Sequence, residues 1–143
     1  NNNNTQKQSA SNCINWLIQH KVPASKLVMG AAFYARVWEE VADIDHGLYQ
    51  AGKFKQGVSY KNADTFFTST PGYHYYFDKK AKAPYRYNAA QKMFATFDDE
   101  RSLKAKTAFI RKHHLGGIMF WELSQDKPVN GLVSVIYKNL NGR

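Results

Sequence analysis

Apolar residues recur at helical spacing near both ends of the chain. Between residues 9 and 20, Ile14, Leu17 and Ile18 fall on one helical face, and Ser9 or Ser11 stands where a cap is expected. Near the other end, four apolar residues share one face of a second predicted helix, Leu132 to Leu140. The pattern therefore predicts an amphipathic helix at each end.

Two short segments have the nearly continuous apolar character of strands in a parallel sheet. They are Lys26–Tyr34 and Ile118–Leu123. Neither alternates strictly between apolar and polar residues, which is typical of strands covered on both faces. A helix of about fifteen residues is predicted before the second strand, because acidic residues from Asp98 open it and basic residues close it, as the helix dipole favours.

The middle of the chain, residues 37–97, differs in composition from the two ends. Tyrosine, phenylalanine and glycine become frequent there, and short strands are predicted at Tyr73–Phe77 and Tyr85–Tyr87, with a helix at Tyr60–Phe67. This segment is predicted to be a small α+β insert placed between the first buried strand and the helix that follows it.

Two parallel strands are too few to form a stable sheet with covered faces and paired edges. The pattern therefore predicts either a piece of a larger α/β protein or a chain that associates with other copies of itself through uncovered strand edges.

Composition and charge narrow the function classes. The chain has 143 residues, of which 43% are hydrophobic and 15% aromatic, enough for a packed core. The single cysteine, Cys13, excludes an internal disulfide or a multi-cysteine zinc site, and no motif indicates a metal or a cofactor. No apolar run approaches the ~20 residues of a membrane span. The net charge of +9 is spread along the chain, which favours a solvated basic surface over nucleic-acid binding.

Three motifs occur in an order that carries a family resemblance. They are KLVMGAAFYAR from Lys26 to Arg36, then APY at Ala83–Tyr85 with FDDERS at Phe97–Ser102, and LGGIMFWE from Leu115 to Glu122. They resemble, in turn, the seventh barrel strand, the exit from the small insertion domain and the eighth barrel strand of the chitinases of glycoside hydrolase family 18. The resemblance covers nearly the whole chain, from about Ser11 to Leu140.

The resemblance implies an α/β fold of a stated kind: the C-terminal βα units of a (β/α)8 TIM barrel with a small α+β insertion domain, the barrel being incomplete in this chain. Residues 1–36 would hold a helix and the seventh strand, residues 37–97 the insertion domain, and residues 98–143 the seventh helix, eighth strand and eighth helix. Ala32 and Ala35 depart from the proline and glycine of the family pattern.

The family's acid-bearing motif, Asp-x-x-Asp-x-Asp-x-Glu, does not occur in the sequence, so no catalytic residue is assigned and the isolated chain is expected to lack hydrolytic activity. The resemblance implies instead that Trp121 forms the floor of a sugar subsite and that Tyr34 and Arg36 hydrogen-bond the sugar. Phe33 is a weaker candidate, equally suited to packing or to lining the cleft. From the residues alone, each of these side chains is also compatible with a structural role.

The implied function is that of a chitinase, which hydrolyses β-1,4-linked N-acetylglucosamine polymers by a substrate-assisted retaining mechanism, with this chain supplying sugar-binding residues. The alternative is a chitin- or oligosaccharide-binding protein of the same fold without catalysis. The expected partner in both cases is chitin or N-acetylglucosamine oligosaccharides, and the expected location is outside the cell or in the periplasm. Relatives that cleave peptidoglycan or N-glycans make the substrate less certain than the reaction type.

Overall fold

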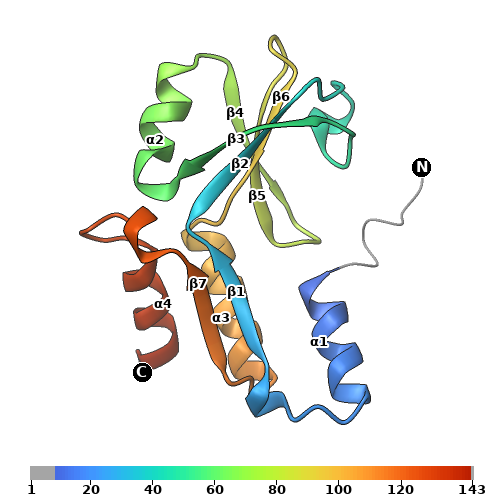
Figure 1. Cartoon of the computed structure of the whole chain (residues 1–143), viewed down its shortest axis with the longest axis vertical. Coiled ribbons are helices and arrows are strands. Elements are labelled where there is room, and N and C mark those ends of the chain that lie inside the picture. Colours follow the sequence, from blue (N-terminus) through green and yellow to red (C-terminus); the bar gives the residue numbers. More distant parts are fainter. Residues whose placement is uncertain (1–8, 143) are drawn as a thin grey trace.

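The computed structural model of the protein describes residues 9–142 (Figure 1). Two groups of elements meet at a narrow joint: an antiparallel sheet with one helix in the upper half of the view, and a pair of parallel strands with three helices in the lower half. The main helices and strands are α1 (Ala10–Gln19), β1 (Val28–Ala32), β2 (Tyr34–Glu39), β3 (Lys53–Ser59), α2 (Tyr60–Ser69), β4 (Tyr73–Asp78), β5 (Ala83–Asn88), β6 (Met93–Thr96), α3 (Glu100–Lys112), β7 (Gly117–Trp121) and α4 (Leu132–Asn141).

The upper sheet has five antiparallel strands in the order β3-β2-β6-β5-β4. Helix α2 covers one face, where Ala35, Val37 and Ala95 of the strands pack with Ala63 and Phe67 of the helix. The predicted α2, β4 and β5 are confirmed. The sheet begins at Tyr34, ahead of the predicted boundary at residue 37, because β2 pairs with β3 from its first residue onward.

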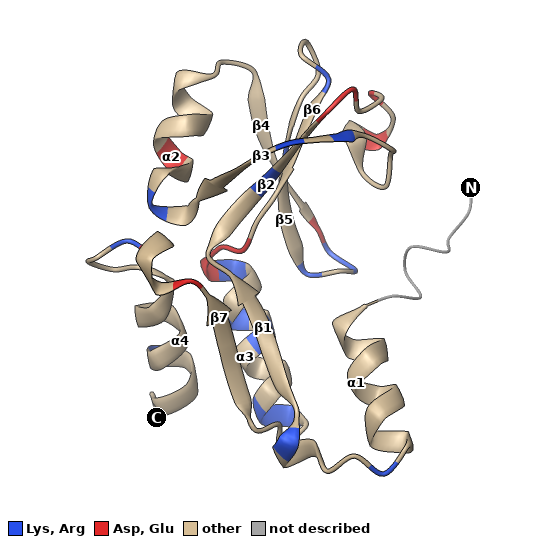
Figure 2. Cartoon of the chain, viewed as in Figure 1, with Lys and Arg blue, Asp and Glu red and all other residues tan. Residues whose placement is uncertain are grey.

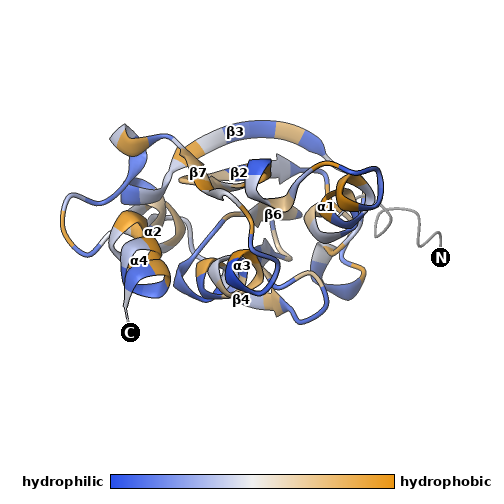
Figure 3. Cartoon of the chain, turned by 90° about the horizontal axis from the view of Figure 1, so that it is seen from below, coloured by the Kyte–Doolittle hydropathy of each residue, from blue (hydrophilic) through white to orange (hydrophobic). Residues whose placement is uncertain are grey.

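Sequence patterns did not predict β3 or β6. Most side chains of β3 are exposed, and its hydrophobic and hydrophilic bands alternate only partly (Figure 3). Strand β6 has only four residues. Both strands are held by pairing with β2 rather than by a strong periodic signal of their own.

The lower pair, β1 and β7, is parallel and in register from Val28↔Gly117 to Ala32↔Trp121. The parallel pairing agrees with the sequence prediction, but the prediction that both faces are covered is wrong for this chain. Helices cover only the face that carries Met29, Ala31 and Phe120, whereas Val28 and Met119 are about half exposed on the other face. Strand β1 also ends at Ala32, so the single predicted strand 26–34 is broken near its end.

Two helices of the lower half, α1 and α3, begin at residues whose side chains cap them. The Ser9 side chain accepts a hydrogen bond from the N–H of Asn12, and Asp99 caps α3 through the N–H of Ser102. Acidic residues gather at the start of α3 and basic residues lie along its length and in the β4–β5 turn (Figure 2). Other lysines and arginines lie on β2, β3 and α2, as the sequence interpretation of a dispersed basic surface predicts.

Among residues 9–142, no helix is both long and apolar enough to cross a membrane.

Tyr73 carries a buried hydroxyl that has no hydrogen-bond partner among the described residues. Burial of this phenol raises its pKa to about 12. Because an unsatisfied buried polar group is unfavourable, we expect Tyr73→Phe to stabilise the fold by roughly 1 kcal/mol in urea unfolding. The phenol that titrates at about pH 12 should also disappear from a spectrophotometric titration.

Tyr87→Phe is the matched control for this change. Tyr87 is also buried, but its hydroxyl donates to the carbonyl of Val41 at 2.9 Å. This second substitution should therefore destabilise the protein by about 1 kcal/mol. Equal losses of stability in the two variants would contradict the distinction.

Candidate carbohydrate-binding groove

A groove of about 670 Å³ lies where the two sheets meet. Its walls come from β2 and β3 on one side and from the end of β7 with the turn after it on the other. The residues lining it are Tyr34, Arg36, Phe54, Gly57, Val58, Ser59, Lys61, Trp121, Ser124 and Gln125. Three of the four residues singled out from the sequence, Trp121, Tyr34 and Arg36, are thus brought together although they come from different sheets.

Trp121 is the last residue of β7, and its side chain is 63% exposed. It lies in register with Ala32, on the face of the strand pair that no helix covers. An indole with an open face at the end of a parallel strand offers an apolar platform of the size of a sugar ring. The peptide bond between Trp121 and Glu122 is cis.

Tyr34 and Arg36 point to the same side of β2, because side chains two residues apart share a face of a strand. The guanidinium of Arg36 lies 5.2 Å from the ring centre of Phe54 and 5.8 Å from that of Trp38. It forms no ion pair with any residue in the described part of the chain. Its N–H groups are therefore positioned by aromatic contacts and remain available to an acceptor in the groove.

Phe33 is where the structure corrects the candidate list. Its side chain is fully buried and stacks on Phe120 with ring centres 4.6 Å apart. A side chain without exposed surface cannot contact a ligand in the groove, so Phe33 belongs to the core beneath it. The physical reason is its place in the chain: Phe33 lies between β1 and β2 and packs with Ala31 on the face that the helices cover, whereas Tyr34 lines the groove.

The backbone of Phe33 nevertheless forms the joint on which the groove is built. Its N–H donates to the carbonyl of Trp121 at 2.9 Å, and its carbonyl accepts from the N–H of Tyr60 at 2.8 Å. One residue thus connects the end of β7 to the start of α2. This connection fixes the distance between the two walls of the groove.

Two lysines join α2 to the loop after β7. Lys61 donates to the carbonyl of Ser124 at 2.8 Å, and Lys127 forms an ion pair with Asp64 at 2.6 Å. The hydrogen bond with Asp64 raises the pKa of Lys127. The ammonium group of Lys127 also lies 5.1 Å from the ring centre of Tyr60, a residue whose pKa is raised by burial. The loop that carries the groove wall is therefore held at several points.

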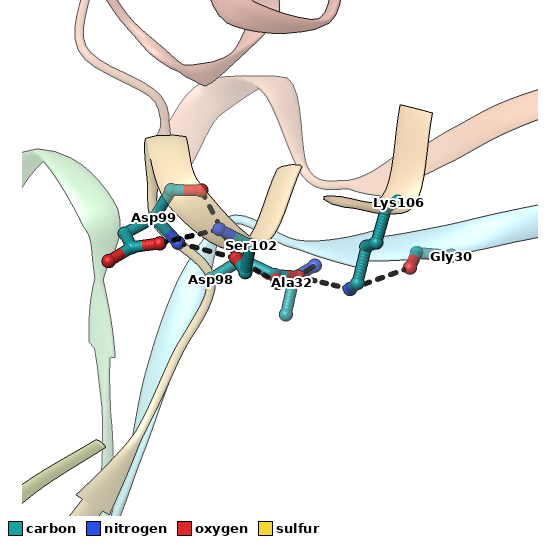
Figure 4. Close-up of polar contacts among 6 residues, drawn as sticks. All are labelled: Gly30, Ala32, Asp98, Asp99, Ser102 and Lys106. Atoms are coloured by element: carbon teal, nitrogen blue, oxygen red, sulfur yellow. Dashed lines mark hydrogen bonds and ion pairs between the residues drawn. The ribbon is translucent and has the colours of Figure 1, made fainter. Parts of the chain in front are cut away.

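A buried carboxylate holds the other end of the joint (Figure 4). Asp98 accepts hydrogen bonds from the N–H of Ala32 at 2.9 Å and from the hydroxyl of Ser102 at 2.7 Å, and it pairs with the ammonium group of Lys106. Lys106 also donates to the carbonyl of Gly30. This network gives Asp98 a structural role, because it holds the start of α3 against the end of β1.

Other acids near the groove also have structural contacts. Glu122 accepts from the hydroxyl of Ser124 at 2.8 Å, and Asp126 accepts from the N–H groups of Leu132 and Val133 at the start of α4. Asp126 thus ties the loop after β7 to the start of α4. Within residues 9–142, no three His, Cys, Asp or Glu side chains are grouped so that they could hold a metal ion.

The groove combines aromatic faces with hydrogen-bond donors, which are groups that a sugar-binding site uses. Aromatic faces come from Trp121 and Phe54, and hydrogen-bond donors from Arg36, Lys61 and Tyr34, while no carboxylate from the described part of the chain lines it. No sequence signal singles out Phe54, Lys61 or Gln125, because β3 has weak patterning and the two polar residues lie in no recognisable motif. Phe54 reaches the groove because β3 pairs with β2, Lys61 because α2 begins directly after β3, and Gln125 because the turn after β7 lies against α2.

A sequence model described as glycosyl hydrolases family 18 matches residues 1–126. The chain belongs to this family. Among curated relatives, Chitinase A1 of Niallia circulans is 41% identical over 114 residues, which are 74% of this chain and 16% of the relative. Chitinase B of Serratia marcescens is 30% identical, with 87% of this chain matching 30% of the relative. The chain thus spans less than a third of the length of these two proteins.

Solved structures agree with the family assignment. A family 18 N-acetylglucosaminidase from Paenibacillus barengoltzii superposes with a TM-score of 0.81 at 31% identity, covering 93% of this chain and 39% of that one. A chitinase-like agglutinin from Robinia pseudoacacia superposes with a TM-score of 0.75 at 28% identity, covering 92% of this chain and 37% of that one. The fold is therefore that of family 18 proteins over nearly all of the chain.

Proposed function

We propose that this chain is the part of a chitinase that grips the sugar polymer, and that the complete protein hydrolyses β-1,4-linked N-acetylglucosamine chains. The observation that carries the proposal is the single groove that gathers Trp121, Tyr34 and Arg36 from two sheets. A sugar ring would stack its C–H face on Trp121 while its hydroxyl and acetamido oxygens accept hydrogen bonds from Tyr34 and Arg36.

The proposed place in the whole protein explains the uncovered face of β1 and β7. In a (β/α)8 barrel, helices cover the outside of the parallel strands and side chains of the inner face fill the interior. The exposed Val28 and Met119 would then face the barrel interior, and Trp121 would stand at the carboxyl end, where barrel enzymes hold their substrates. The antiparallel sheet would form one wall of the cleft.

Catalysis in this proposal needs a carboxylic acid from another segment of the protein. That acid would protonate the glycosidic oxygen as its bond to the anomeric carbon breaks, while the carbonyl oxygen of the substrate's own acetamido group attacks that carbon. Water would then open the cyclic intermediate and return the proton to the carboxylate. The role of this chain is to hold the sugar so that its acetamido group can reach the anomeric carbon.

Trp121→Ala tests the proposed sugar platform. Because a lost aromatic contact at the centre of a site weakens binding by about 1 to 3 kcal/mol, calorimetry with the tetramer of N-acetylglucosamine should show a correspondingly higher Kd. Trp16→Ala is the matched control, since Trp16 is 56% exposed on α1 and does not line the groove. An unchanged Kd in the Trp121 variant would remove this residue from the site.

A sugar-binding protein without catalysis is the second candidate, favoured by the likeness to the Robinia agglutinin. The two functions differ in one measurement, the release of reducing ends from N-acetylglucosamine oligosaccharides by the complete protein. Binding without release would establish the second candidate. Release from bacterial cell wall alone would overturn chitin as the substrate.

For either function, a polymeric substrate outside the cell requires export of the protein.

A further inference from the structure

A second cavity, of about 420 Å³, lies on the same face of the antiparallel sheet as the groove. It is enclosed by the sheet, by the loop of residues 40–52 and by the β4–β5 turn. The residues lining it are Trp38, Val41, Gly47, Leu48, Tyr49, Gln50, Gly52, Asp78, Ala81, Ala83, Pro84, Tyr85, Phe94 and Thr96. None of them lines the groove, so the cavity is a separate site.

The loop over this cavity is held in place by close backbone contacts. The N–H of Val41 donates to the carbonyl of Lys92, and the hydroxyl of Tyr87 donates to the carbonyl of Val41, each at 2.9 Å. Gly47 has a φ of +77° and lies so close to Tyr87 that an added Cβ would be 2.6 Å from its ring. The cavity is therefore preformed, as small-molecule sites usually are.

Aromatic rings form its floor. Tyr85 and Phe94 stack with ring centres 5.3 Å apart and an angle of 26° between their planes, and Trp38 follows at 6.2 Å from Phe94. Polar groups of Gln50 and Thr96 stand among the lining residues. A flat apolar floor with a few hydrogen-bonding groups around it suits a ring that is apolar on its face and polar at its edge.

The charges around the cavity exclude most charged ligands. No lysine, arginine or histidine of residues 9–142 lines it, so an anion would find no cationic partner among them. The carboxylate of Asp78 already accepts hydrogen bonds from the hydroxyl of Tyr49 and from the N–H groups of Lys80 and Ala81. A neutral ligand rich in hydroxyl groups fits this setting best.

We propose that this cavity is an accessory binding site for one neutral pyranose unit, an N-acetylhexosamine if the proposed function holds. Three side chains separate the cavity from the groove: Trp38, Phe54 and Arg36. The ring centres of Trp38 and Phe54 are 6.2 Å apart, and the guanidinium of Arg36 lies over both rings. One sheet face thus offers two aromatic sites in a row. Such an arrangement can hold two parts of one polymer, and it raises affinity for long chains over short ones.

Ala81→Trp tests the cavity directly. Ala81 is exposed in the β4–β5 turn and lines the cavity, so an indole there should fill it without disturbing the core. Lys79→Trp places the same ring in the same turn, at a residue that does not line the cavity, and is the matched control. Unchanged thermal unfolding would show that both variants are folded.

The readout is a ¹H–¹⁵N NMR titration of the chain with N-acetylglucosamine and with its tetramer. Amides of Gly52, Ala81 and Thr96 should shift with the monomer in the parent chain, in Lys79→Trp and in Trp121→Ala. In Ala81→Trp the Kd obtained from the amides of Gly52 and Thr96 should rise by at least about tenfold. Gln50→Ala, which removes one polar side chain from the lining, should weaken the same response.

Two results would overturn the proposal: no shift of the cavity amides at sugar concentrations that saturate the groove, or the same cavity Kd in Ala81→Trp as in the control. Failure of the proposed function would be seen elsewhere, as absence of shifts at Gly57 and Trp121 in the groove. Cavity shifts without groove shifts would support the accessory site alone. Absence of both would overturn both proposals.

Discussion

Asp98→Ala should lower the free energy of unfolding by about 3–5 kcal/mol, the range found when one partner of a buried ion pair is removed. The carboxylate is 6% exposed and holds three donors: the N–H of Ala32, the hydroxyl of Ser102 and the ammonium group of Lys106. Truncation leaves all three without this acceptor. The Lys106 side chain is only 29% exposed, so water replaces the carboxylate poorly.

Urea unfolding of the two proteins gives this difference. The control is Glu100→Ala, two residues away, whose ion pair with Lys104 joins two side chains that are each more than half exposed. That change should shift stability little, because exposed ion pairs are weak. Similar losses in the two variants would show that Asp98 acts only as another surface acid near the start of α3.

Phe33→Ala should cost about 3–5 kcal/mol of stability, as large-to-small changes of buried aromatic residues do. The ring has no exposed surface, stacks on Phe120 and belongs to the cluster of Leu103, Leu132 and Ile136. The backbone hydrogen bonds of residue 33 to Trp121 and Tyr60 persist in the variant, so the loss reports on the side chain alone.

The stability loss of Phe33→Ala in thermal or urea unfolding should be compared with that of Phe54→Ala. Phe54 is 55% exposed and lines the groove, so its truncation should affect stability much less than that of Phe33. If the order of stability losses were reversed, the assignment of Phe33 to the core and of Phe54 to the groove wall would be wrong.

The sequence predicted the elements that have strong periodic or capping signals. Helices α1 and α4 were predicted because apolar residues repeat on one face, with Ser9 or Ser11 as a cap for α1, and α3 was predicted because acidic residues open it and basic residues close it. Strands β1 and β7 were predicted by their apolar runs. Their one-sided burial could not be predicted, since a run of apolar residues does not say which face a helix will cover.

The candidate site was only partly predictable, and for a physical reason. Motif matches named Trp121, Tyr34 and Arg36, which the fold brings to one groove. Phe33 could be excluded only with the break between β1 and β2 known, because the side chain of a residue outside both strands has no face set by strand alternation. The walls from β3 and from the loop after β7 depend on contacts between residues far apart in the chain, such as Lys61 with Ser124.

The chain enters and leaves the antiparallel sheet through adjacent strands, since Arg36 of β2 is paired with Thr96 of β6. A unit whose two ends lie side by side forms a cassette. Such a unit can be inserted into a loop, enlarged or exchanged without moving the strands and helices on either side of it. In this molecule the cassette supplies a wall of the groove and the whole accessory cavity. Substitutions in the antiparallel sheet can therefore change ligand preference while the parallel strands and their helices stay unchanged.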